Sequence, residues 1–140
     1  MNNFNLRCNC SNREGINDIR EGIRDIREGL GDIIRGRNAI LRNNIFEGIR
    51  LINEGIRDIE EGLGDICEGL RDIRNNGNRE GIRDIQEGVR DICEGLQDID
   101  EGLNDIHRGN IPRGIRDINE GIRDIEEGLR DIMEGLRDIV

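Results

Sequence analysis

Few residues of this 140-residue chain carry side chains that can do chemistry. A hydrolytic triad needs a nucleophile beside a histidine base, but the chain has one serine, no threonine and a single histidine, His107. It contains no Glu-x-x-His pair of the kind that builds a di-iron bundle, and its two Gly-x-Gly segments lack the third glycine of a dinucleotide fingerprint. We therefore expect no enzyme activity, no cofactor, no metal site and no small-molecule substrate.

Two of the four cysteines, Cys8 and Cys10, lie in the polar segment 1–12. A Cys-x-Cys pair with no second pair nearby is too little for a zinc site. We expect this segment to be a flexible tail whose exposed thiols crosslink a neighbouring molecule where the surroundings are oxidising. The alternative is a plain unstructured leader.

The other two cysteines, Cys67 and Cys93, fall at equivalent places in a repeating apolar pattern. The simplest interpretation is a small apolar residue at the edge of a helix contact. If the segments on either side pair about residue 77, Cys67 lies opposite residue 87. The offset of six residues, about 9 Å along a helix, predicts no simple disulfide between them.

The acidic composition limits the class of partner. The net charge of −10 argues against nucleic acid, whose binding needs a net basic face. No run of 18 apolar residues exists, so we expect no membrane span. The segment 1–12 also lacks the apolar stretch of a secretory signal, so export would need another route. The compartment stays open between a cell or spore surface and the cytoplasm.

Glycine divides the chain into four copies of one unit. The first glycines of successive units, Gly15, Gly48, Gly81 and Gly114, lie 33 residues apart, and within each unit glycine recurs every seven residues. A charged fraction of 37% would suit a disordered chain, but the regular spacing of isoleucine and leucine indicates order. Ankyrin and tetratricopeptide repeats have a similar period, but their signature residues are absent and we recognise no family.

Each unit holds four heptads of the form Glu-Gly-Ile-Arg-Asp-Ile-x, whose positions we label f, g, a, b, c, d and e. Position d is isoleucine in every heptad, and position a is apolar in all but one, where it is Arg37. Apolar residues spaced three and four apart form one face of an α-helix, although a seven-residue β-solenoid rung is the alternative. Turn-forming clusters and a Ser11–Glu14 capping box predict helices over 13–41, 46–74, 79–107 and 112–140, with antiparallel neighbours.

The glycines at position g predict unusually close helix packing. Together they cost about 8–16 kcal/mol relative to alanine, so some contact must offset them. The pattern resembles the Alacoil, an antiparallel packing mode with alanine at heptad spacing, and the resemblance is one of geometry. The alternative is that the glycines were carried along when a short repeat duplicated. The expected helix-packing residues are Gly15, Gly22, Gly29, Gly48, Gly55, Gly62, Gly69, Gly81, Gly88, Gly95, Gly102, Gly114, Gly121, Gly128 and Gly135 at g, with Ile19, Ile26, Ile52, Ile59, Ile85, Ile92, Ile118 and Ile125 at d.

The sequence therefore predicts an all-α fold of four antiparallel helices with Alacoil-like close packing. Its expected organisation is a tail, 1–12, and a four-repeat domain, 13–140, divided into 13–45, 46–78, 79–111 and 112–140. Since every helix carries the same stripe, a helix of a second chain can replace an internal one. The predicted function is a structural, self-assembling filament, sheath or surface layer whose partner is itself. The alternative is a discrete four-helix bundle that serves as a scaffold or protein-binding module.

Overall fold

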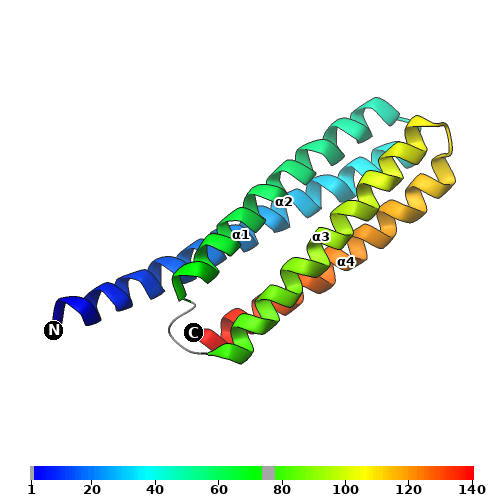
Figure 1. Ribbon diagram of the computed structural model, residues 1–140. Helices are drawn as coiled ribbons and strands as arrows, with labels where there is room; N and C mark the ends of the chain where they lie inside the picture. The colour runs from blue at the N-terminus through cyan, green and yellow to red at the C-terminus, as the bar shows by residue number, and fades with distance from the viewer. Residues whose placement is uncertain (1, 74–77) are drawn as a thin grey trace.

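In the computed structural model the chain folds into four α-helices (Figure 1). The structure describes residues 2–73 and 78–140, and it describes the side chains of residues 13–73 and 78–140. The helices are α1 (Asn2–Leu41), α2 (Ile45–Ile73), α3 (Arg79–His107) and α4 (Ile111–Ile139). Within the described residues no strand occurs, so the predicted all-α fold is confirmed and the β-solenoid is excluded.

Three of the helices begin and end within a residue of their predicted bounds, but α1 begins at Asn2, well before residue 13. The segment before Gly15 contains neither glycine nor proline, so nothing in it stops a helix. Ser11 therefore lies inside α1 and not at its start. The side chains of residues 1–12, and with them the predicted crosslinking by Cys8 and Cys10, lie outside the described residues.

Asparagine side chains cap the starts of α3 and α4. The Asn78 side chain accepts a hydrogen bond from the backbone N–H of Gly81 (3.3 Å), and Asn110 accepts one from Arg113 (3.4 Å). Both bonds satisfy a donor that a helix start leaves free. Two residues with positive φ, Asn43 and Gly109, stand in the turns after α1 and α3, where the chain reverses.

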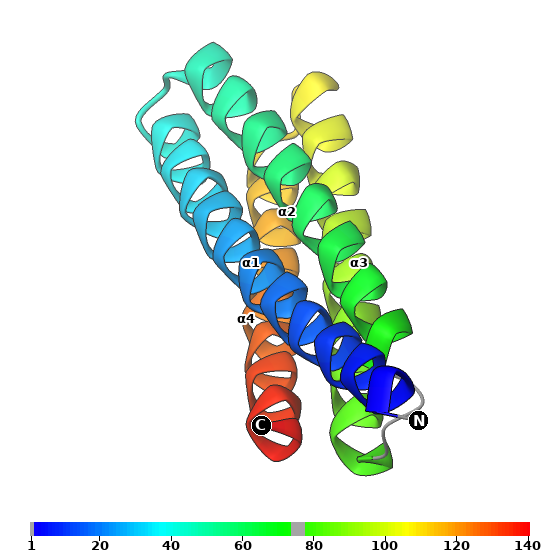
Figure 2. The ribbon, with the colours of Figure 1, turned by 90° about the vertical axis from the view of Figure 1, so that its left-hand side faces the viewer.

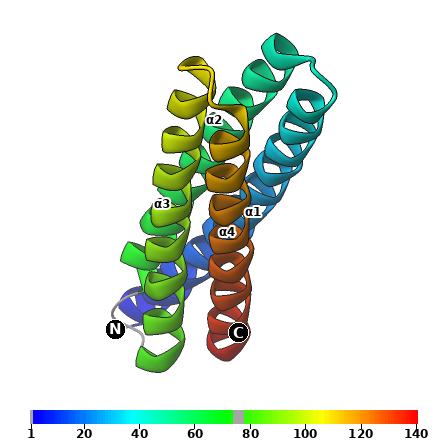
Figure 3. The same ribbon diagram turned by 90° about the vertical axis from the view of Figure 1, so that its right-hand side faces the viewer.

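The helices form two antiparallel hairpins, α1–α2 and α3–α4, which cross one another (Figures 2 and 3). The close backbone approaches lie almost entirely within the hairpins; between them, α1 meets α4 and α2 meets α3 less closely. The connection from α1 to α2 and that from α3 to α4 lie at one end of the molecule, and the C-terminus lies at the other (Figure 1).

Two different stripes of each helix make these two kinds of contact. The d isoleucines, among them Ile59 and Ile92 at 0% exposure, are buried beside the glycines inside the hairpins. The a residues join the hairpins: Ile23 of α1 meets Leu136 of α4 at a shared groove. The predicted a/d core is thus divided, because the absence of a glycine Cβ makes g and d the face of closest approach.

Candidate functional site

The glycine faces of the two hairpins are the closest contacts in the molecule. A Cβ added to Gly22 would lie 2.5 Å from the carbonyl oxygen of Gly62, and one added to Gly62 would lie 2.6 Å from that of Gly22. Real Cβ atoms do not come that near to a backbone oxygen. The relation is reciprocal along both hairpins. The facing pairs are Gly15/Gly69, Gly22/Gly62, Gly29/Gly55, Gly36/Gly48, Gly81/Gly135, Gly88/Gly128, Gly95/Gly121 and Gly102/Gly114.

The structure places every one of the predicted helix-packing glycines on these faces. It adds Gly36, which the degenerate first-repeat heptad had obscured and which faces Gly48. Each added Cβ would also meet an isoleucine side chain of the opposite helix, such as Ile125 for Gly95, at 2.9 Å. The Gly31 and Gly64 positions differ, because a Cβ there would meet nothing within 4 Å. Every glycine at position g therefore packs against the neighbouring helix of the same chain.

Aspartates at position c lie near one another beside glycine contacts of both hairpins, an arrangement that the sequence interpretation missed. Desolvation, a hydrogen bond to Asp124 and the charge of that carboxylate together raise the pKa of Asp98 to about 6. Desolvation and the neighbouring Asp105 raise the pKa of Asp117 in the same way. The cause is the close approach itself, because side chains next to a glycine face are brought as near as the backbones. Antiparallel register was the signal that could have revealed these pairs.

Raised aspartate pKa values occur in both hairpins. Desolvation raises the pKa of Asp58, with a further contribution from the charge of Asp32, and it raises that of Asp131, with Asp91 as the main charged neighbour. Within the described residues, however, no group of three or more histidine, cysteine or acidic side chains is arranged to hold a metal ion. Each of these aspartates also has further acidic side chains near it, such as Glu120 for Asp98.

The edge between α1 and α4 carries a groove of about 470 Å³ that is lined by apolar and basic side chains. Its apolar lining consists of Ile23, Met133, Leu136 and Val140, and its basic lining consists of Arg20, Arg24, Arg27 and Arg137. None of these arginines pairs with a carboxylate in the described part of the chain. A basic, partly apolar groove on a chain of net charge −10 suits an anionic partner with an apolar surface.

The opposite edge, between α2 and α3, carries a related cavity of about 380 Å³. Its lining includes Cys67, Leu70 and Arg71 of α2 with Gln86 and Val89 of α3. Since two repeats span 66 residues, these positions are the equivalents of Met133, Leu136, Arg137, Arg20 and Ile23 in the first groove. The two edges differ at the e positions, where one has arginine and methionine and the other has glutamine and cysteine.

The cysteines lie at or near this edge. Cys67 and Cys93 are both exposed free thiols. Burial raises the pKa of the Cys93 thiol and the charge of Cys67 raises it further, so the two thiols lie within electrostatic range of one another. Cys67 shares its cavity with Gln86 and Val89, on either side of the predicted residue 87, and Cys93 lies one helical turn beyond Val89.

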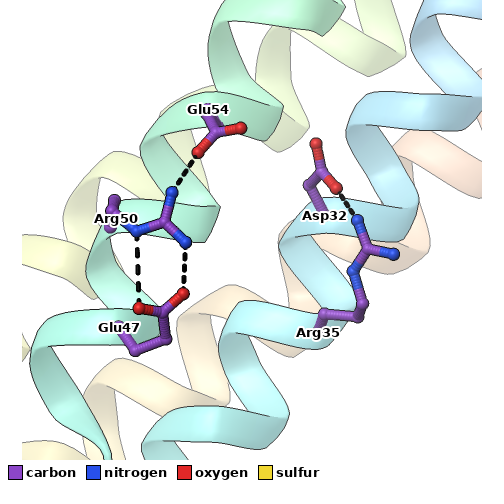
Figure 4. A network of polar contacts seen from close by, with 5 residues as sticks. All are labelled: Asp32, Arg35, Glu47, Arg50 and Glu54. Carbon is purple, nitrogen blue, oxygen red and sulfur yellow. Dashed lines mark hydrogen bonds and ion pairs between the residues drawn. The ribbon is translucent and has the colours of Figure 1, made fainter.

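The outer helix faces carry ion pairs between arginine and acidic side chains (Figure 4). Arg50 binds Glu47, three residues earlier, and Glu54, four residues later, the second at 2.6 Å. On α1, Arg35 binds Asp32. The hydrogen bond from Arg50 lowers the pKa of Glu47. These contacts lie in solvent, so they add to solubility and helix formation more than to tertiary structure.

No helix in the described residues combines the length and apolar character that crossing a bilayer requires. Comparisons of the chain with protein-family models, with curated proteins and with solved structures give no match.

Proposed function

We propose that this protein is a structural building block that associates with copies of itself and catalyses no reaction. The proposal rests on one observation. The large apolar side chains most exposed in the described residues are Leu41 (61%), Phe46 (92%) and Val140 (69%). Leu41 and Phe46 lie at the end where α1 turns into α2, and Val140 lies at the opposite end (Figure 1).

Apolar surface at opposite ends favours contact between unlike ends. A head-to-tail contact that does not close into a ring continues as an open filament. The glycine faces stiffen each copy of the chain, because the two helices of a hairpin already pack against each other there. A helix of a second copy reaches a glycine face only by replacing an internal helix, as in domain swapping.

Sedimentation velocity over a wide concentration range tests the proposal, with negative-stain imaging of the same samples. We expect species that grow with concentration, and we expect Phe46→Ser to shift them toward the single chain. Asn44→Ser, an exposed polar change in the same turn, is the matched control. Single chains at every concentration, or growth that Phe46→Ser leaves unchanged, would contradict end-to-end association.

The arginine-lined groove between α1 and α4 supports a second candidate, a discrete bundle that binds an acidic amphipathic helix of another protein. Such a helix would place apolar side chains against the apolar lining and carboxylates near the arginines. Fluorescence anisotropy with a labelled model helix of leucine and glutamate measures this binding. We expect Arg24→Ser with Arg137→Ser to weaken it at least tenfold, whereas Arg83→Ser on exposed α3 leaves it unchanged. Equal binding by the unchanged protein, the double arginine variant and the Arg83→Ser control would exclude the groove as the binding site.

A further inference from the structure

The contact between the two hairpins has the widest backbone spacing in the bundle. Inside a hairpin, glycine lets one backbone touch the other, but between hairpins the contact passes through a and e side chains. The α2–α3 edge approaches less closely than the α1–α4 edge. A bond across α2 and α3 would therefore have a large effect on whether the hairpins stay together.

The internal symmetry of the repeats indicates which positions of that edge are equivalent to those of the α1–α4 edge. At the α1–α4 edge, Nη2 of Arg27 donates a hydrogen bond to Sδ of Met133 at 3.1 Å. Two repeats later, the position equivalent to Arg27 is Cys93, and two repeats earlier, the position equivalent to Met133 is Cys67. The repeat symmetry thus places one thiol on each side of the α2–α3 edge, at the positions that bear Arg27 and Met133 at the other edge.

Other observations agree with this placement. Cys67 lines the cavity between α2 and α3 together with Val89, one helical turn before Cys93. Both cysteines are exposed, so a small reagent reaches them. The Cys67 thiol lies close enough to Cys93 to contribute to the raised pKa of that thiol.

We propose that Cys67 and Cys93 form a reversible disulfide that fastens the two hairpins together across the α2–α3 edge. The oxidant is a small-molecule disulfide such as oxidised glutathione. One cysteine thiolate attacks the reagent's sulfur–sulfur bond and releases a glutathione thiolate. The second cysteine thiolate then attacks the mixed disulfide and releases the other. Two protein thiols are oxidised, one reagent disulfide is reduced, and the two protons pass to solvent.

The disulfide would act on the joint between the hairpins and would leave the glycine faces unchanged. It closes a loop between residues 26 apart in sequence, which restricts the unfolded chain. The reduced protein keeps two hairpins held by apolar contacts and by side-chain hydrogen bonds between α1 and α4, such as the one from Arg37 to Asn119 (3.0 Å). The inference is independent of self-association, since both cysteines belong to one chain.

The test uses the full chain with Cys8→Ser and Cys10→Ser, so that only two thiols remain. Folded protein is incubated with oxidised glutathione, and its mass and tryptic peptides are measured. We expect a mass lower by two hydrogen atoms and a crosslinked product of peptides 58–71 and 91–108. The melting temperature should rise by roughly 5–15 °C and return on reduction. Cys67→Ser in the same background should show neither change.

A second measurement separates a folded-state contact from chance encounter. The yield of the internal disulfide at a fixed ratio of oxidised to reduced glutathione is compared in buffer and in concentrated urea. We expect the internal disulfide to be favoured at least tenfold more in buffer, because the fold holds the thiols together. Glutathione adducts on both cysteines without an internal bond, bonds only between chains, or equal yields in urea would each overturn the proposal.

Discussion

At the scale of the residue, glycine has two roles in this chain that depend on its position in the heptad. At position g, a Cβ would collide with the backbone of the opposite helix; for Gly121 the distance to the carbonyl oxygen of Gly95 would be 2.5 Å. At position b, Gly64 is exposed and a Cβ would meet nothing within 4 Å. One substitution therefore has opposite effects at the two positions.

We expect Gly121→Ala to destabilise the protein by about 1–3 kcal/mol, because neither backbone can yield without separating the helices. Gly64→Ala is the matched control and should stabilise by about 0.5–1 kcal/mol through helix propensity alone. Urea unfolding followed by circular dichroism measures both changes. A stabilising effect of Gly121→Ala would mean that the glycine face is more open than the structure describes.

The facing aspartates predict that mild acid stabilises the fold. The pKa of Asp98 is about 6 in the folded protein against a usual 3.8, so the folded state binds the proton more tightly. This contribution is full below the unfolded pKa and is lost as pH rises through about 6. We expect stability to increase by about 1 kcal/mol between pH 7.5 and pH 5, allowing for solvent screening. Thermal melts across this range measure the effect.

The substitution Asp98→Asn isolates this pair. It removes the repulsion with Asp124 at neutral pH, so it should raise the melting temperature at pH 7.5 and reduce the dependence on pH. Glu94→Gln, an exposed change on the same helix, is the control and should leave that dependence intact. A pH profile that Asp98→Asn does not alter would assign the effect to other groups.

At the scale of the element, each helix uses two stripes for two different partners. Position d lies on the glycine face and is buried in nearly all the described heptads; Ile92 has 0% exposure. Position a lies toward the other hairpin and is buried less evenly, with Val89 only partly covered. Shortening the side chain should therefore lower the free energy of unfolding more at position d than at position a. The sequence pattern alone assigns both positions to the core.

We expect Ile92→Ala to destabilise the protein by about 2–5 kcal/mol, since it leaves a cavity where the glycine face prevents collapse. Val89→Ala, one turn away on the same helix, should cost about 1 kcal/mol or less because that side chain is partly in solvent. Chemical denaturation of the two variants measures the difference. Equal costs would contradict the division of the core into a tight and a loose stripe.

At the scale of the whole molecule, the bundle is a pair of tightly packed hairpins whose backbones approach each other less closely than the two helices within a hairpin do. Leu129, 6% exposed at position a, belongs to the joint, whereas Ile125, fully buried at position d, belongs to a hairpin. We expect Leu129→Asn to let the hairpins separate while amide protons on the glycine faces stay protected from hydrogen exchange. Ile125→Asn should remove protection from α3 and α4 together. Simultaneous loss of all protection in Leu129→Asn would show one cooperative unit.

The local sequence was enough to place the helices. The glycine and isoleucine spacing and the turn clusters act within a few residues, so three of the four helices have the predicted bounds to within a residue. The start of α1 was missed because the capping box at Ser11 has no helix stop before it. The heptad pattern also indicated close antiparallel packing, because only position g lacks a Cβ throughout.

Only the tertiary structure decided which faces meet. Every helix carries nearly the same stripe, so the sequence could not tell whether the partner of Gly95 belonged to the same chain or to another. Nor could it supply the register between α2 and α3 that brings the Cys67 thiol within electrostatic range of Cys93. Register depends on how whole rows of side chains fit together, and that sum of many contacts is absent from any single heptad.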